Sequence, residues 1–190
     1  MTALDDASVL LLIDLQRAFD REPWPRRWNH DVDRNGLAVL AAWRRAGRPV
    51  IHVRHDSVEP GSTLASGLPG NMFREGFEPL PGEPIVGKSV NAAFIGTDLD
   101  IQLRQRGTRS IVTFGISTDM CVSTTVRVGA NLGYRMTVVG DACDCFDLRD
   151  ERGDVVPAEL VHRIHLATLR YEFAAVVTAA EMLDALPRER

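Results

Sequence analysis

Long hydrophobic runs and cysteines are scarce in this sequence, and both shortages limit what the protein can be. No stretch approaches the roughly 20 consecutive apolar residues of a membrane span, so we expect no membrane partner. The residues before the first apolar run are acidic rather than basic, which is not the pattern of a secretory signal. Three cysteines, an odd number, do not fit a disulfide framework. A reducing, cytoplasmic location is therefore expected.

Clusters of basic residues are missing too. The 190 residues carry a formal net charge of −4 at pH 7, and no run of Lys and Arg reverses it locally. We therefore expect no nucleic-acid partner. Apolar residues make up 45% and charged residues 25%, which is ordinary for a globular protein. The length suits one compact domain over residues 1–190.

Short apolar segments alternate with amphipathic ones along the chain. Continuous apolar runs such as SVLLLID (8–14) are typical of strands buried on both faces. Strands are predicted at 8–14, 49–55, 84–89, 109–115, 134–141 and 173–178. Helices are predicted at 31–47, 97–107, 157–172 and 179–186, and another begins within 115–134. This alternation predicts an α/β fold, a three-layer doubly wound domain around a six-stranded, mainly parallel sheet.

The ends of some elements have their own signals. Gly47 and Gly107 are expected to stop the first two helices, and Thr97 to be the N-cap of the second. Residues 56–84 are rich in Gly and Pro, and a loop of that length is either functional or disordered. Four apolar residues within it predict an ordered loop that packs on the domain and shapes a pocket: Leu68, Met72, Phe73 and Phe77.

Three chemically useful residues follow separate strands at their carboxyl ends. Asp14 ends the first strand, Lys88 follows the third, and Cys121 lies just beyond the fourth. Ligands of parallel sheets bind at this edge, so we expect the three side chains to meet there. An acid, a base and a thiol together can form a covalent hydrolase site. A helix that begins near residue 118 or 119 is expected to favour the thiolate of Cys121.

Each of these residues also has a purely structural interpretation. Cys121 belongs to a helical stripe with Thr125, Val128 and Leu132, so it is either a packed core residue or a nucleophile. Asp14 either caps a turn or transfers protons, and Lys88 is either a surface lysine or part of a site. The joint placement of the three favours a catalytic set.

Three motifs resemble those of the isochorismatase-like cysteine hydrolase superfamily, in the same order and across essentially the whole chain. They are LLIDLQRAF (11–19), VGKSVNAAFIGTDL (86–99) and GISTDMCVSTTVR (115–127). The superfamily includes nicotinamidases, N-carbamoylsarcosine amidohydrolases and streptothricin hydrolase. The resemblance implies a catalytic triad of Asp14, Lys88 and Cys121 and a cis peptide bond between Ile116 and Ser117. It further implies an oxyanion hole formed by the backbone N–H groups of Ser117 and Cys121, and a homo-oligomer, a dimer or larger.

Residues that follow Asp14 and Lys88, or that end the second strand, are candidates for substrate contacts. Gln16 and Phe19 follow Asp14, and Asn91 and Phe94 follow Lys88; the two phenylalanines are equally compatible with core packing. Arg54 and His55 end the second strand, and Arg54 suggests a substrate with a carboxylate or another anionic group.

Two further pairs of residues have an open role. Trp24 and Trp28 either close over the site or pack against the first helix, and packing is favoured. Cys143 and Cys145 are interpreted as small buried residues rather than a second redox site.

The resemblance has limits that bear on cofactors. Nicotinamidases bind a metal through an Asp-x-His pattern and a further His, whereas this chain has HVRHDS (52–57). His52 and His55 lack the usual third ligand, so we expect no metal and no other cofactor. True isochorismatases, which cleave a vinyl ether, typically lack the cysteine.

The presence of Cys121 therefore favours an enzyme that cleaves a C–N bond of a small amide, carbamoyl or ureido compound through a thioester. The alternatives are an isochorismatase-type reaction without covalent attack, and a non-hydrolytic protein that binds a ligand or senses oxidants on the same scaffold.

Overall fold

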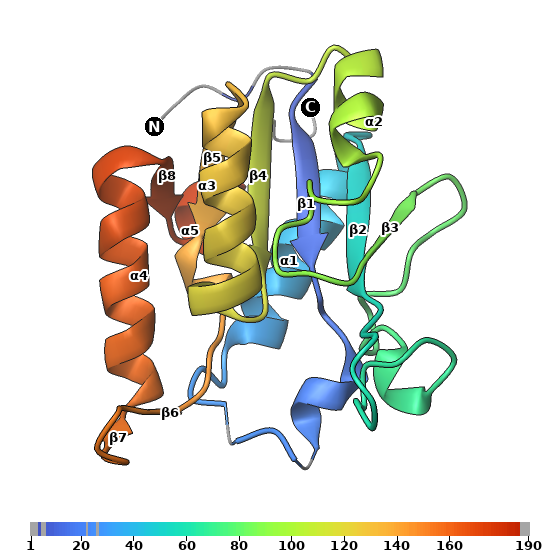
Figure 1. Ribbon diagram of the computed structural model, residues 1–190. Coiled ribbons are helices and arrows are strands. Elements are labelled where there is room, and N and C mark those ends of the chain that lie inside the picture. Colours follow the sequence, from blue (N-terminus) through green and yellow to red (C-terminus); the bar gives the residue numbers. More distant parts are fainter. Residues whose placement is uncertain (1–3, 5–6, 22, 26, 187–190) are drawn as a thin grey trace.

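The central strand β1, Val9–Ile13, has five residues that are all buried, as expected for a strand covered on both faces. The computed structural model describes residues 4, 7–21, 23–25 and 27–186 (Figure 1). A six-stranded sheet has the order β3-β2-β1-β4-β5-β8, and every neighbouring pair in it is parallel. The other strands of this sheet are β2 (Val50–His55), β3 (Ile85–Lys88), β4 (Ser110–Gly115), β5 (Arg135–Val139) and β8 (Ala174–Val177).

Helices cover both faces of the sheet, which confirms the predicted three-layer α/β fold. Figure 1 shows α3 and α4 on one side of the sheet and α1 and α5 on the other. The α-helices are α1 (Val32–Arg45), α2 (Leu99–Gln105), α3 (Ser123–Asn131), α4 (Ala158–Glu172) and α5 (Ala179–Ala185). Short turns of other helix types are η1 (Arg17–Asp20), η2 (Pro69–Asn71), η3 (Thr118–Val122) and η4 (Gly140–Ala142). None of the helices in the described chain is long and apolar enough to cross a membrane.

The six predicted strands and the predicted helices are confirmed, and where a range was predicted its bounds differ from the observed ones by at most two residues. Gly47 and Gly107 have φ values of 64° and 69° just past the first two helices, as expected of residues that end a helix. The predicted cap of the second helix was wrong by one residue. Asp98 is the N-cap, while the Thr97 hydroxyl accepts from the backbone N–H of Leu99 at 3.3 Å.

The long loop 56–84 is ordered and packs on the domain, but only some of its apolar residues are responsible. Phe77 is fully buried and Phe73 is 9% exposed. The expectation for Leu68 and Met72 was wrong, since their exposed fractions are 46% and 53%. A two-stranded antiparallel hairpin, β6 (Leu148–Arg149) with β7 (Val155–Val156), was not predicted because each strand has only two residues.

The last residue of β4 requires glycine. Gly115 has a φ of 148°, and a Cβ atom there would collide with the backbone of Ile13 on the neighbouring strand. This close approach brings the chain that follows β4 next to the chain that follows β1. Both segments leave the sheet at its carboxyl edge, which lies toward the lower side of Figure 1.

We expect Gly115→Ala to lower the free energy of unfolding by about 3 kcal/mol or more, because it combines an unfavourable φ with overpacking. Gly133→Ala is a matched control, since Gly133 also has a positive φ (93°) but a Cβ atom there would meet nothing within 4 Å. The control should cost about 1–2 kcal/mol. Urea denaturation of both variants measures the difference, and equal costs would contradict the steric role of Gly115.

Candidate active site

The ammonium group of Lys88 joins the three residues that the sequence analysis singled out. Its Nζ atom lies 2.6 Å from Asp14 Oδ2, 3.3 Å from Cys121 Sγ and 3.0 Å from His55 Nδ1. The side chains of Lys88 and Asp14 are both 0% exposed, and Cys121 is 8% exposed. The predicted convergence of Asp14, Lys88 and Cys121 at the carboxyl edge is therefore present.

Strand register explains how these side chains meet. Lys88 is paired in register with His55 on the adjacent strands β3 and β2, so both project at the same level of the sheet. Asp14 follows β1 directly, and its backbone N–H donates to the carbonyl of Val53 on β2 at 3.1 Å. Asp14 has a φ of 51°, the only positive φ among the described residues other than glycine. Such backbone geometry costs about 1–3 kcal/mol and is concentrated at functional sites.

Cys121 lies in η3, a π-helical turn that precedes α3. The peptide bond between Ile116 and Ser117 is cis, as the resemblance implied. The turn is attached to the chain after β5, because the backbone N–H and the hydroxyl of Thr118 donate to the carbonyl of Asp144 at 2.8 and 3.1 Å. His162 on α4 supports it further, with Nδ1 at 2.8 Å from the Thr118 hydroxyl.

Burial dominates the electrostatics of the cysteine. It raises the pKa of the Cys121 thiol, the Asp14 carboxylate raises it further, and the Lys88 ammonium opposes both effects. We had expected the helix terminus to favour a thiolate; the direction of this shift instead indicates a protonated thiol at rest. Burial also raises the pKa of the Asp14 carboxyl above 3.8, although the nearby Lys88 ammonium acts to lower it. Asp14 Oδ1 is buried without a hydrogen-bond partner in the described structure, so it is available to receive a proton.

A cavity of about 370 Å³ opens beside Cys121. Five of the predicted site residues line it: Phe19, His55, Asn91, Ser117 and Cys121. The Asn91 side-chain oxygen is 3.7 Å from Cys121 Sγ. Trp24, for which packing was favoured, lines the cavity and also packs edge-on against Phe19, with ring centroids 4.7 Å apart.

The described residues that line this cavity do not include three of the predicted substrate contacts. Gln16 is fully buried, and its side-chain amide accepts from the backbone N–H of His55 at 2.8 Å and donates to its carbonyl at 3.1 Å. Gln16 therefore positions His55. Arg54 forms an ion pair with Asp56, with 2.8 Å between Nε and Oδ1, and the ring of Phe94 stacks on that of Tyr134 in the core.

Sequence reasoning missed two contributors to the site. Asn71, in the long loop, donates from its side chain to the carbonyl of His55 at 3.0 Å and to that of Leu64 at 2.9 Å. It anchors the loop over the end of β2. Phe146 lines the cavity beside Trp24, with ring centroids 5.4 Å apart. An apolar residue after the fifth strand was the available signal for Phe146; no local pattern marks Asn71.

The two histidines of the second strand have separate environments. His52 Nε2 is 2.8 Å from Glu83 Oε2, whereas the ring of His55 faces Lys88. Burial and the nearby Lys88 ammonium lower the pKa of His55 below 6.5, so its imidazole is neutral at pH 7. Ligand atoms of Asp14, His55 and Cys121 lie within 4.8 Å of one another, a spacing that a metal ion could use. In this structure the Lys88 ammonium contacts all three of these side chains and already supplies a positive charge.

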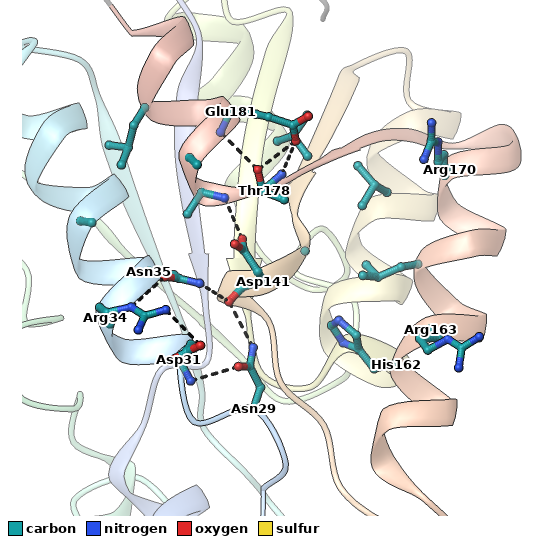
Figure 2. Close-up of a pocket in the computed structure, with 18 of the residues that line it drawn as sticks. Asn29, Asp31, Arg34, Asn35, Asp141, His162, Arg163, Arg170, Thr178 and Glu181 are labelled. Atoms are coloured by element: carbon teal, nitrogen blue, oxygen red, sulfur yellow. Dashed lines mark hydrogen bonds and ion pairs between the residues drawn. The ribbon is translucent and has the colours of Figure 1, made fainter.

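A larger cavity of about 1060 Å³ lies between α1, α4 and α5, away from Cys121 (Figure 2). Figure 2 shows Asp141 near its centre; the Asp141 carbonyl accepts from Asn29 and Asn35, each at 3.1 Å. Thr178 and Glu181 form a capping box at the start of α5. Most of the polar groups labelled between α1 and α5 bond to one another, and no cysteine is among the described residues that line this cavity. We therefore assign the chemistry to the smaller cavity.

Comparison with known proteins agrees with this geometry. A family model described as the isochorismatase domain matches residues 8–181. The chain belongs to the isochorismatase family. It is 34% identical to the isochorismatase family protein YrdC of Bacillus subtilis, over 95% of this chain and 97% of that protein. It is 32% identical to a streptothricin hydrolase of Streptomyces noursei (98% and 75% covered). It is also 28% identical to the ureidoacrylate amidohydrolase RutB of Methylobacterium radiotolerans (97% and 81% covered).

Solved structures of the family superpose closely. A protein of the isochorismatase family from Chromobacterium violaceum has a TM-score of 0.93 and 41% identity, with 98% of this chain and 96% of that chain covered. A cysteine hydrolase from Pseudomonas syringae pv. phaseolicola has a TM-score of 0.89 and 28% identity, with 98% and 95% covered. Family membership makes this chain a hydrolase of the isochorismatase family.

We expect Lys88→Met to slow the alkylation of Cys121 by iodoacetamide at pH 8 by about tenfold or more, because the ammonium lowers the pKa of the thiol. Peptide mass spectrometry over a pH series measures the rate. Arg104→Met removes an exposed cation of α2 and is the control. An unchanged rate in Lys88→Met, with circular dichroism showing a folded protein, would contradict the electrostatic role of Lys88.

His162 should make the fold acid-sensitive. It is 5% exposed, and burial lowers its pKa from 6.5 to about 4. The folded state therefore binds this proton less readily than the unfolded state. The contribution of the neutral ring is complete above pH 6.5 and is lost as the pH falls toward 4.

Over that range wild-type protein should lose up to about 3 kcal/mol more than His162→Gln, which still offers Thr118 a hydrogen-bond partner. Urea unfolding at several pH values tests this difference. Parallel stability curves for the two proteins would show that His162 does not titrate as described.

Proposed function

We propose that this hydrolase cleaves a C–N bond of a small amide, carbamoyl or ureido compound through a thioester on Cys121. The observation that carries the proposal is the position of Cys121. This residue lines a cavity, and Lys88 Nζ lies 3.3 Å from its Sγ atom and 2.6 Å from Asp14 Oδ2. A cysteine that served only for packing would not require a buried acid and a buried base beside it. The names of two relatives, an amidohydrolase and a cysteine hydrolase, support the same reaction class.

The first half of the proposed reaction forms the thioester. Asp14 accepts the proton of the Cys121 thiol as Sγ attacks the carbonyl carbon, which matches the raised pKa of both groups. Lys88 stabilises the negative charge that moves between them. The backbone N–H groups of Ser117 and Cys121 are proposed to stabilise the oxyanion. Asp14 then gives its proton to the leaving nitrogen, the C–N bond breaks, and the amine departs.

The second half restores the enzyme. Asp14 accepts a proton from a water molecule, whose oxygen attacks the thioester carbon. The C–S bond breaks, the sulfur recovers a proton from Asp14, and the carboxylic acid leaves. Each cycle consumes one water and releases one amine and one acid.

His55 accepts a hydrogen bond from Lys88 at Nδ1. Its neutral ring therefore carries its proton on Nε2, and this ring lines the cavity.

Ammonia release from a panel of amides, carbamoyl compounds and ureides tests the proposal. Cys121→Ala should lower kcat by more than about 1,000-fold, because the covalent route is lost. Cys143→Ala removes a buried thiol that does not line this cavity and should retain activity.

Mass spectrometry of wild-type protein that is acid-quenched during turnover should reveal an added acyl mass on Cys121. Asp14→Asn should lose both the acyl mass and ammonia release, because Asp14 accepts the thiol proton in the first step. Full activity in Cys121→Ala would overturn the covalent mechanism and favour hydrolysis by Asp14 and Lys88 alone. No turnover of any compound by the wild-type protein would favour a binding role.

A further inference from the structure

The charged residues that line the cavity beside Cys121 are all acidic among those that the structure describes. The residues that line it include Glu59, Asp119 and Asp147, while no Arg or Lys is among the described lining residues. None of these three acids forms an ion pair with a described basic residue, and only Asp147 is held by a backbone group, the N–H of Ala158 at the start of α4, at 2.8 Å. Asp119 Oδ1 is buried and has no hydrogen-bond partner in the described chain.

The remaining charges at the site do not offset these carboxylates. Asp14 and Lys88 compensate each other at 2.6 Å, and the lowered pKa of His55 leaves its ring neutral at pH 7. The basic residue that suggested an anionic substrate, Arg54, is bound to Asp56 and does not line the cavity. The expectation of an anionic substrate therefore loses its basis.

The walls of the same cavity are aromatic. Phe19, Trp24 and Phe146 form a cluster in which every pair of ring centroids lies between 4.7 and 5.9 Å apart. The negative faces of aromatic rings attract cations, and they do so more strongly where water is excluded. Rings and carboxylates thus line one cavity with the proposed nucleophile, and both favour a positively charged ligand.

We propose that the substrate is a cationic amide, a small compound that carries a protonated amine or a guanidinium group in addition to the C–N bond to be cleaved. This inference rests on the proposed function for the cleavage step only, because the charge preference belongs to the cavity itself. The acyl group lies at Cys121, and the cationic group lies among the aromatic rings and the carboxylates of Glu59, Asp119 and Asp147. A carboxylate-bearing amide of the same length is rejected, since three like charges line its site.

The charge preference can be measured without any turnover. Three methanethiosulfonate reagents, which carry a trimethylammonium, a neutral or a sulfonate group, are allowed to react with Cys121. Each reaction rate is divided by the rate of the same reagent with free glutathione, which corrects for intrinsic reactivity. The cationic reagent should react about tenfold or more faster than the anionic one at low salt, and the ratio should shrink in 0.5 M salt, roughly as screening predicts. Peptide mass spectrometry assigns the modification to Cys121 rather than Cys143 or Cys145. Equal rates, or a faster anionic reagent, would overturn the proposal.

A matched pair of variants tests the origin of that ratio. Glu59→Gln combined with Asp119→Asn removes two carboxylates from the cavity and should reduce the ratio at least about threefold. Asp98→Asn combined with Glu172→Gln removes the same charge from the exposed N-cap of α2 and an exposed residue of α4, and should preserve the ratio. An equal reduction in both double variants would mean that only net charge matters, which contradicts a specific site.

Three amides of similar length then test the preferred substrate charge separately from the proposed reaction. They are the cationic 6-aminohexanamide, the neutral 6-hydroxyhexanamide and the anionic 6-amino-6-oxohexanoate. Ammonia release should be fastest from the first and slowest from the last. Preferred hydrolysis of the anionic compound would overturn the inference and leave the proposed reaction standing. A cation-preferring Cys121 with no hydrolysis of any of the three would count against the proposed reaction while supporting the charge of the site.

Discussion

A single buried ammonium group, that of Lys88, is the constraint on which the site depends. A charge removed from water is costly unless it is paired and hydrogen-bonded. Here the ammonium contacts the carboxylate of Asp14, the thiol of Cys121 and the ring of His55 at 2.6, 3.3 and 3.0 Å. Removing any one partner leaves part of that charge uncompensated. The ends of three strands and the turn after a fourth must therefore stay in one arrangement.

The chemistry of lysine suits this place better than that of arginine. Lys88 is the only lysine among the 22 basic residues of the chain, and the other 21 are arginines. An ammonium is a compact charge with three donors in different directions, which matches three acceptors that surround it. A guanidinium is a planar fork suited to one carboxylate, as in the contact between Arg44 and Glu83 at 2.7 and 2.8 Å. The chain uses arginine for such pairs and its single lysine for the site.

The sheet carries the alignment of the site. His55 and Lys88 are register partners, and a slip of one residue in β3 would turn Lys88 to the opposite face. Gly115 keeps β4 close to β1, so that Cys121 and Asp14 enter the same edge. Gln16 and Asn71 fix the backbone of His55 from two sides. The sheet thus aligns the reacting side chains, while loops and turns supply most of the cavity wall, and the long loop closes one of its sides.

Local patterns in the chain were sufficient for the fold and for the three residues at the strand ends. Buried parallel strands read as continuous apolar runs, helices have their own period and stop signals, and the order of the two predicts the topology. The carboxyl-edge rule then placed Asp14, Lys88 and Cys121 together. These inferences succeed because each depends on residues that are neighbours in the chain.

The surroundings of the nucleophile were decided by the tertiary structure. Gln16 and Phe94 lie within the motifs and Arg54 lies near the end of β2. In the structure, however, Gln16 binds the backbone of His55, Phe94 stacks on Tyr134, and Arg54 pairs with Asp56. The acidic residues and rings that line the cavity come from segments as distant as residues 19, 59 and 146. The protonation of Cys121 likewise follows from burial rather than from its place at a helix start. Which charges remain unpaired, and which side chains lose their water, depends on contacts between distant segments that no local pattern records.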